Sequence, residues 1–171
     1  MYKCLIGFAA VIVLLLTGGC MEKQVNPEEE KAVIKQVIEN SIGWAKNKDT
    51  DLLYSCFAHD ANLFWYVPEN NDAQVGFESF KDVVNNVFMN DAFKAVRFET
   101  KDMVINLSRD GSVAWWHCLL DDVNEWNGQQ FSWINVRWTG VLEKQDGKWV
   151  IVQQHFSNSV DDIKQRIQSK G

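Results

Sequence analysis

Hydrophobic residues recur at helical spacing in the first half of the chain and alternate with polar residues in much of the second half. The helical pattern begins at Asn26 and Pro27, which suit a helix N-cap and the first helical turn, and it extends to about Lys46. Asp49 or Thr50 is expected to cap a second, shorter helix. The pattern therefore predicts two successive helices at the start of the folded region.

Strand patterns surround a third predicted helix. Residues 62–67 are a strand candidate that Pro68 ends, and Gly76 precedes a helix with apolar residues on one face. From Phe93 onward apolar and polar residues alternate, and a change of parity near Lys101 predicts a β-bulge. Three turn signals divide the region up to residue 157 into four strands of an antiparallel meander: Asp110-Gly111, Asn127-Gly128 and Asp146-Gly147.

This order of elements indicates an α+β domain whose helices cover one face of a sheet. Residues 112–120 are apolar on both faces of their predicted strand. The second face is therefore also expected to be covered, for example by a second copy of the chain. Residues 160–168 are expected to form a short C-terminal helix or a frayed tail.

The N-terminal segment has the organisation of an export signal. Lys3 precedes an apolar run over residues 5–16, which is shorter than the roughly 20 residues that a membrane-spanning helix needs. The run ends in Thr-Gly-Gly-Cys at residues 17–20, which resembles the lipobox of bacterial lipoproteins. The resemblance implies cleavage before Cys20, a diacylglycerol on its thiol and export to the bacterial cell envelope, where the lipid anchors the protein to the membrane. An ordinary signal peptide cut nearby, or a membrane-anchored N-terminus, is the alternative.

The net charge of the chain indicates which kinds of partner it is expected to bind. The chain has 17 Lys and Arg residues against 23 Asp and Glu residues, a formal net charge of -6. An acidic chain without a basic patch is a poor partner for nucleic-acid phosphates, so no nucleic acid is expected. The histidines, at positions 59, 117 and 155, fall in separate predicted elements, and no Cys/His spacing suits zinc. No metal and no cofactor are expected.

The cysteines do not require a disulfide framework. Cys4 lies in the export signal and Cys20 is the predicted lipidation site. Cys56 and Cys118 remain, in different predicted elements. An oxidising compartment would permit a disulfide between them, but two buried free thiols are the favoured interpretation.

Five stretches carry a family resemblance: Trp44 through Asp60-Ala61, Gly76 before the third helix, Val113-Ala114-Trp115, Arg137 to Leu142 (RWTGVL) and Gly147 to Ser157 (GKWVIVQQHFS). Together they resemble the SnoaL-like branch of the NTF2-like superfamily. The resemblance implies an α+β fold, the cystatin-like cone, in which a curved antiparallel sheet packs on three N-terminal helices and leaves a conical pocket. It also implies a homodimer through the outer face of the sheet.

The resemblance gives the expected organisation of the chain. Residues 1–19 are the lipoprotein signal peptide, and residues 20–27 are the lipidated cysteine and its tether. Residues 28–158 are the SnoaL-like domain, and residues 159–171 are the tail or short helix. Members of the superfamily include isomerases, polyketide cyclases, dehydratases and epoxide hydrolases beside non-catalytic binding modules, so the fold alone leaves the function open.

The strand at residues 130–143 has two distinct faces. Its even positions are apolar, whereas its odd positions, among them Trp133, Arg137 and Thr139, mix aromatic and polar groups. Ligand pockets combine apolar walls with a few placed polar groups, so the odd face is the favoured pocket face. The alternative is that the odd face is the outer, partly wet face and the even face is the core.

The last hairpin tests this choice. A three-residue loop over residues 145–147 would place Arg137 opposite His155 and Gln153 opposite Thr139. Arg137 and His155 are then expected on one face, with their side chains near each other. A two-residue loop would pair residues of opposite parity instead.

The expected pocket residues are aromatic or polar and lie on the predicted helix and strand faces that enclose the cone. For Trp44 and Phe64 a place in the core is favoured over a ligand contact, and Arg137 could equally form an ion pair with Asp60 or Asp121. The full expected set is Trp44, Phe64, Tyr66, Trp115, His117, Trp133, Arg137, Gln153 and His155.

Three functions fit these residues. The first is a lipid-anchored module that binds a small hydrophobic or anionic molecule, which Arg137 would orient. The second is a cofactor-free isomerase, cyclase or dehydratase that uses His155 or Asp60 as base and Arg137 or Tyr66 to stabilise an enolate-like oxygen. The third is a structural or interaction subunit with a vestigial pocket. The sequence leaves open whether the protein is an enzyme.

Overall fold

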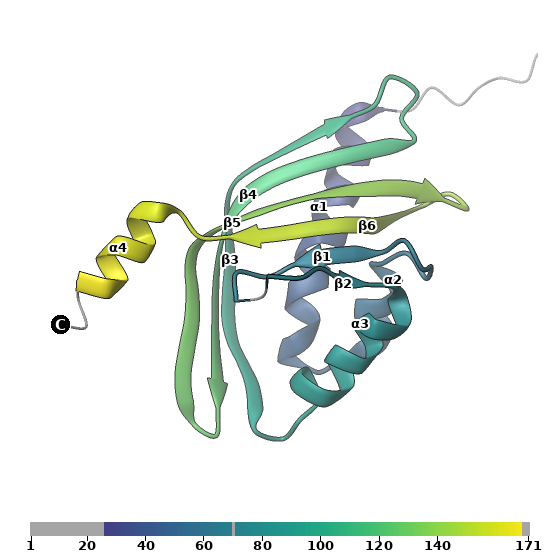
Figure 1. Ribbon diagram of the computed structural model, residues 1–171. Helices are drawn as coiled ribbons and strands as arrows, with labels where there is room; N and C mark the ends of the chain where they lie inside the picture. Colours follow the sequence, from purple (N-terminus) through teal and green to yellow (C-terminus); the bar gives the residue numbers. More distant parts are fainter. Residues whose placement is uncertain (1–25, 70, 169–171) are drawn as a thin grey trace, which may run out of the picture.

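A curved sheet of six strands packs around the long first helix in the computed structural model, which describes residues 26–69 and 71–168 (Figure 1). The strand order is β2-β1-β6-β5-β4-β3. The strands are β1 (Phe64–Tyr66), β2 (Gln74–Val75), β3 (Phe93–Leu107), β4 (Val113–Trp126), β5 (Gln129–Gln145) and β6 (Lys148–Ser157). The helices are α1 (Pro27–Gly43), α2 (Thr50–Ser55), α3 (Phe77–Val83) and α4 (Val160–Gln168), with a 3-10 turn η1 (Trp44–Lys46) and a π-helical turn η2 (Val84–Phe88).

The helix boundaries follow the local signals in the sequence. The side chain of Asn26 accepts a hydrogen bond from the amide of Glu28, and that of Asp49 accepts one from Leu52. Gly76 precedes α3 with a φ of 87°, a backbone conformation that favours glycine. These findings confirm the three predicted N-terminal helices and show that the residues up to Lys46 end in a 3-10 turn.

The predicted meander is confirmed, but the sheet is mixed and not wholly antiparallel. Strands β3 to β6 pair antiparallel in chain order, whereas β1 pairs parallel with β6. The chain returns from α2 along the free edge of β6, where pairing satisfies the backbone groups of that edge. The two-residue strand β2, within a segment expected to be mostly loop, extends the sheet beyond β1.

The β5–β6 turn corrects the predicted register. It is a two-residue Asp146-Gly147 turn, because Gln145 pairs with Lys148. A register shift then occurs between the pairs Leu142–Ile151 and Val141–Gln153, so one extra β6 residue restores equal parity. As a result His155 lies opposite Thr139, and Arg137 lies opposite Ser157. Arg137 and His155 do share a face, as expected, through a turn and a bulge and not through a three-residue loop.

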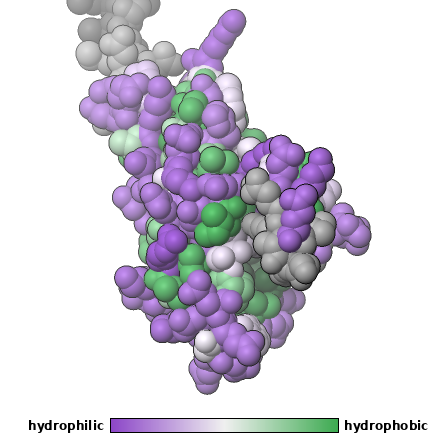
Figure 2. All heavy atoms as spheres, turned by 90° about the vertical axis from the view of Figure 1, so that its left-hand side faces the viewer, coloured by the Kyte–Doolittle hydropathy of each residue, from purple (hydrophilic) through white to green (hydrophobic). Residues whose placement is uncertain are grey.

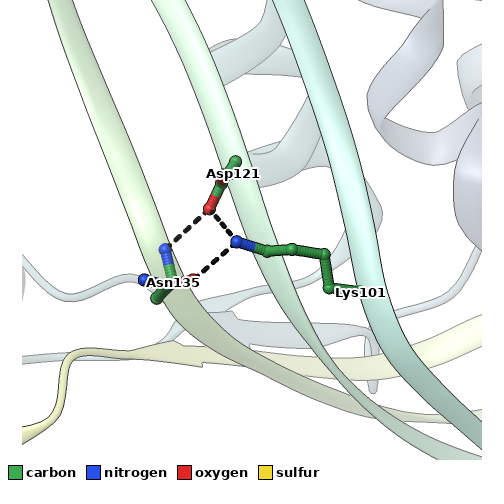
Figure 3. A network of polar contacts seen from close by, with 3 residues as sticks. All are labelled: Lys101, Asp121 and Asn135. Carbon is green, nitrogen blue, oxygen red and sulfur yellow. Dashed lines mark hydrogen bonds and ion pairs between the residues drawn. The ribbon is translucent and has the colours of Figure 1, made fainter.

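A second irregularity lies in the middle of β4 and β5. The register shifts between Leu120 and Asp122, and Asn135 has a positive φ of 53°. Figure 3 shows the polar network at this point: Asp121 accepts hydrogen bonds from Lys101 Nζ and from the backbone amide of Asn135, both at 2.8 Å. The Asn135 side chain also accepts a hydrogen bond from Lys101. The network fixes a β-bulge that exchanges the two faces of β5.

The core lies between the helices and the concave face of the sheet. Trp116 and Trp138 are its largest fully buried side chains and meet edge to face. Gly140 lies beneath the Trp116 ring, where a side chain would collide with it. The apolar even positions of β5 after the bulge, such as Val136 and Leu142, belong to this core.

The two cysteines in the described region are free and buried, which matches the favoured interpretation. Burial raises the pKa of Cys56 to about 11 and that of Cys118 to about 12. Both thiols therefore stay protonated at neutral pH and act as small hydrophobic groups in the core.

The two ends of the chain bear on the predicted anchor and tail. The export signal and Cys20 lie outside the described residues. Within the part of the chain that the structure describes, no helix has both the length and the apolar character needed to cross a bilayer. Residues 160–168 form α4, which extends away from the sheet and helices (Figure 1).

Candidate functional site

A cavity of about 390 Å³ lies between the C-terminal end of α1, the α3–η2 segment and the ends of β4 and β5 that meet at the Asn127-Gly128 turn. Its volume lies within the usual range for small-molecule sites. Its wall is mainly apolar, and ten of its lining residues are aromatic, among them Trp44, Trp65, Phe88, Phe93, Trp133 and Phe156. Such a wall is suited to an apolar or aromatic ligand.

The rim of this cavity is also apolar. Val87, Trp126 and Phe131 line it and are at least 39% exposed. At one side of the rim, the indole N–H of Trp133 donates a hydrogen bond of 2.8 Å to Glu69 in the segment between β1 and β2. This contact ties the β1–β2 segment to β5 beside the opening.

The polar groups of the cavity are few. Ser41 donates to the carbonyl of Ile38, and Gln154 accepts a hydrogen bond from the buried indole of Trp138. These two side chains therefore have partners in the protein. Asp122 and Asn124 lie side by side on β4, with Asn124 Nδ2 donating to Asp122 Oδ2 at 2.9 Å.

Asp122 is the less exposed of the two acidic groups in the wall, the other being Glu69 at the rim. Burial raises the pKa of Asp122, and the hydrogen bond from Asn124 only partly offsets this effect. A carboxyl group with a raised pKa in an apolar cavity can exchange a proton with a bound molecule more readily near neutral pH than a surface aspartate can.

Asp121 and Asp122 face opposite sides of β4. Asp121 points to its partners Lys101 and Asn135, whereas Asp122 lies on the cavity side together with Leu120, because side chains alternate along the strand. Burial opposes the ionisation of Asp121, but the hydrogen bonds from Lys101 and Asn135 and the charges of Lys101 and Arg97 outweigh it and lower its pKa. The two neighbouring carboxyl groups thus have opposite pKa shifts because they face different environments.

The structure places only part of the expected pocket set at the cavity. Trp44 and Trp133 line it. The others lie on the opposite face of the sheet. For Arg137 the cause is the bulge at Asn135, which brings Trp133 to the cavity and turns the later odd positions of β5 away from it. This group comprises Phe64, Tyr66, Trp115, His117, Arg137, Gln153 and His155.

That outer face has its own contacts. The Tyr66 and His155 rings meet edge to face at 6.0 Å, and His117 and His155 both lie opposite Thr139. Trp115 is 46% exposed on the same face. Figure 2 shows apolar residues among hydrophilic ones on the side of the molecule from which α4 extends. The homodimer expected through this face stays a prediction.

The expected partners of Arg137 are engaged elsewhere. Asp121 pairs with Lys101, and Asp60 is exposed and accepts backbone hydrogen bonds from Asn62 and Leu63, which fixes a turn. Among the side chains that the structure describes, no carboxylate lies within ion-pair distance of Arg137. Asp60 does not line the cavity either.

One sequence pattern could have indicated Asp122, a cavity residue that was not predicted. Asp121 and Asp122 are adjacent acids within a strand that is otherwise largely apolar, and two such residues cannot both face outward unless the strand is bulged. Asn124 and the apolar rim carried no comparable signal. No group of three or more metal-ligating side chains is found in the region that the structure describes.

The mixed curved sheet, the helices within its curve and the aromatic cavity define an NTF2-like α+β cone. The chain belongs to the SnoaL-like domain family, whose model matches residues 34–161. No curated protein is similar enough in sequence to count as a relative.

Solved structures share the fold at low sequence identity. An NTF2-like superfamily protein from Salmonella enterica has a TM-score of 0.68 at 18% identity, covering 79% of this chain and 94% of its own. A candidate dehydratase of the NTF2-like family from Streptomyces avermitilis has a TM-score of 0.67 at 14% identity, covering 79% and 99%. A candidate aromatic ring hydroxylase from Novosphingobium aromaticivorans has a TM-score of 0.64 at 13% identity, covering 78% and 91%. At these identities the likeness concerns the fold alone.

Proposed function

We propose that this protein binds a small hydrophobic molecule in the aromatic cavity and is held at the bacterial cell envelope by a lipid on Cys20. The observation that supports binding is the cavity itself: about 390 Å³, an aromatic wall and few polar groups. Arg137, which was expected to orient the ligand, is exposed on the other face of the sheet and has no part in this proposal.

A substitution at the rim tests the binding proposal. Val87→Trp is expected to fill the opening and abolish ligand binding, because Val87 lines the cavity and is 39% exposed. The measurement is a thermal-shift screen of small aromatic acids, sterol-like and polyketide-like compounds. A compound at ten times its Kd should raise the Tm of the wild type by about 3 °C or more and that of Val87→Trp by less than about 1 °C.

The matched control is Val33→Trp, on the exposed side of α1 and away from the cavity, where the valine is 53% exposed. It is expected to keep the full ligand-induced shift. A wild type that no compound stabilises would contradict the proposal and favour an interaction subunit with a vestigial pocket. An equal loss in both variants would show that the added indole acts through the fold and not through the cavity.

Asp122 favours a second candidate function, a cofactor-free enzyme that transfers protons. The group that would act as acid or base is Asp122, since His155, Arg137 and Asp60 lie outside the cavity. A compound that binds should then be converted by the wild type, as followed by its mass or absorbance. Asp122→Asn should still bind the compound within about threefold and lose at least about 100-fold in kcat. Binding without any turnover by the wild type leaves the binding module as the function.

The lipid anchor has its own test. Cys20→Ala is expected to move the full-length protein from the membrane fraction to the soluble fraction in a bacterial host, because the thiol would carry the diacylglycerol. Cys4→Ala, within the segment removed on cleavage, is the matched control and should stay with the membranes. An unchanged distribution of Cys20→Ala would refute lipid anchoring at this residue.

A further inference from the structure

The charged side chains in the described wall of the aromatic cavity are all acidic. Asp122 and Glu69 line it, whereas no Lys, Arg or His of the described chain does. The exposed Lys46 lines a smaller hollow to which Asp122 also contributes. Even so, no basic side chain that the structure describes lies within ion-pair distance of Asp122. The cavity therefore repels an anionic ligand and attracts a cationic one.

Asp122 and Asn124 provide free acceptor oxygens in this wall. Asn124 Nδ2 donates to Asp122 Oδ2 at 2.9 Å, so the two groups are in contact. In the part of the chain that the structure describes, neither Asp122 Oδ1 nor Asn124 Oδ1 accepts a hydrogen bond. Asn124 is only 6% exposed, and a buried acceptor without a partner is costly. A molecule in the cavity with N–H donors and no acceptor, such as an ammonium group, would complete the hydrogen bonding of this pair.

Two aromatic residues lie beside this pair on the next strand. Trp133 lies opposite Asp122, and Phe131 lies opposite Asn124, in the β4–β5 pairing. Residues directly opposite each other have Cβ atoms about 5 Å apart, and all four line the cavity. The Trp133 indole N–H donates to Glu69 at 2.8 Å, which places a carboxylate at the edge of that ring. Cations bind the faces of aromatic rings, and tryptophan binds them best.

We propose that the ligand is an organic cation, an aromatic or apolar primary amine whose body fills the cavity and whose ammonium group binds Asp122, Asn124 and the ring of Trp133. The inference rests on the proposed binding function and names the chemical class of its ligand. An apolar body gains by leaving water for the aromatic wall. The ammonium group gains charge-assisted hydrogen bonds from the carboxylate and the amide oxygen.

The protonation of Asp122 is consistent with a missing cation. Burial raises the pKa of Asp122, and no positive side chain offsets this effect. A bound ammonium group would favour the charged carboxylate and lower that pKa again. Asp122 is half-buried, and the neighbouring Phe131 is 46% exposed at the rim. The ion pair would therefore keep contact with water, which limits the cost of removing two charges from it.

The test compares amines, alcohols and acids of the same skeleton. The first set is 2-(2-naphthyl)ethylamine, 2-(2-naphthyl)ethanol and 2-naphthylacetate, and the second is decylamine, decan-1-ol and decanoate below their micelle concentrations. Binding is measured by calorimetry at neutral pH, where the amines are charged. In at least one set, wild type is expected to bind the amine about tenfold more tightly than the alcohol and the acid least well.

Two variants and a control assign this preference to the proposed contacts. Asp122→Asn keeps the shape and removes the charge, so it should weaken the amine to within about threefold of the alcohol and leave the alcohol unchanged. Asn124→Leu, of similar size, removes one acceptor and should also weaken the amine more than the alcohol. Asp51→Asn removes an exposed carboxylate on α2 outside the cavity and should change neither.

The outcomes distinguish this inference from the proposal on which it rests. Equal affinity of amine and alcohol in wild type, or a preference for the amine that persists in Asp122→Asn, would overturn the inference while the cavity remains a binding site. Binding of a compound from the thermal-shift screen but of no amine would do the same. If neither these probes nor any compound of that screen binds, both proposals fall. In the enzyme alternative Asp122→Asn keeps the affinity and loses turnover, so the same variant separates the two roles of Asp122.

Discussion

Replacing Gly140 by alanine is expected to lower the free energy of unfolding by about 3 kcal/mol or more, the largest steric loss among the glycines that the structure describes. A Cβ at this position would lie 2.5 Å from the backbone oxygen of Gln153 and still closer to the ring of Trp116. Neither neighbour can yield easily, since the first is backbone of the adjacent strand and the second is a fully buried indole. The measurement is urea unfolding monitored by tryptophan fluorescence.

Gly43→Ala is the matched control. Its added Cβ would meet only the tip of the Phe98 ring, at 3.1 Å, and Phe98 is partly exposed and free to shift. Alanine also has the better helix propensity, so the net change should stay within about 1 kcal/mol. Equal losses for the two variants would contradict the close contact between Trp116 and Gly140.

Asp121→Ala is expected to lower the free energy of unfolding by about 2–3 kcal/mol at pH 7. The substitution removes the acceptor for Lys101 Nζ and for the Asn135 amide, both at 2.8 Å, and leaves those donors in a partly buried place (Figure 3). Because the same network fixes the bulge that brings Trp133 to the cavity, ligand affinity should fall as well. Denaturant unfolding and ligand titration measure the two effects.

The pH dependence of this loss has a definite sign. The pKa of Asp121 is lower in the folded protein than its unfolded value of about 3.9, so its contribution is complete above about pH 4. It is lost as the pH falls through the folded pKa. The difference between wild type and Asp121→Ala should therefore be constant from pH 7 to about pH 5 and shrink at lower pH.

Glu78→Ala serves as the control for removing a carboxylate. Glu78 pairs with Lys81 on the surface of α3, and its side chain is 82% exposed, so the loss should stay within about 0.5 kcal/mol. A loss for Asp121→Ala as small as this would show that the bulge does not depend on the network.

Most of the fold could be predicted because its signals are local. A capping side chain such as Asn26 or Asp49 acts within three residues of itself, and the glycine of each Asp-Gly or Asn-Gly pair adopts the positive φ that tight turns require. The parity change near Lys101 was also readable, because apolar residues moved from one set of alternate positions to the other. The parallel pairing of β1 with β6 was not readable, since it joins segments far apart in the chain.

The site was harder to predict because one unrecognised bulge moves every later side chain to the other face. Trp133 and Arg137 have the same parity in the sequence, yet Asn135 lies between them with a positive φ, so only Trp133 faces the cavity. Asp122 was missed because alternation along β4 does not by itself tell which of two adjacent acids faces the cavity. Asp121 faces the other side, where it binds Lys101, a residue of β3 that has no fixed spacing from it in the sequence.

The direction of α1 determines which way the cavity would face in the cell. The helix begins at Pro27, close to the predicted tether, and the cavity is lined by residues at and beyond its other end, such as Ile42 and Trp44 (Figure 1). A helix of 17 residues is about 25 Å long. With Cys20 in the bilayer, the start of α1 would stay near the lipid headgroups while the opening reached outward. The protein would then take its ligand from the aqueous phase and not from the bilayer. The lipid anchor would serve only to keep the protein at the membrane surface.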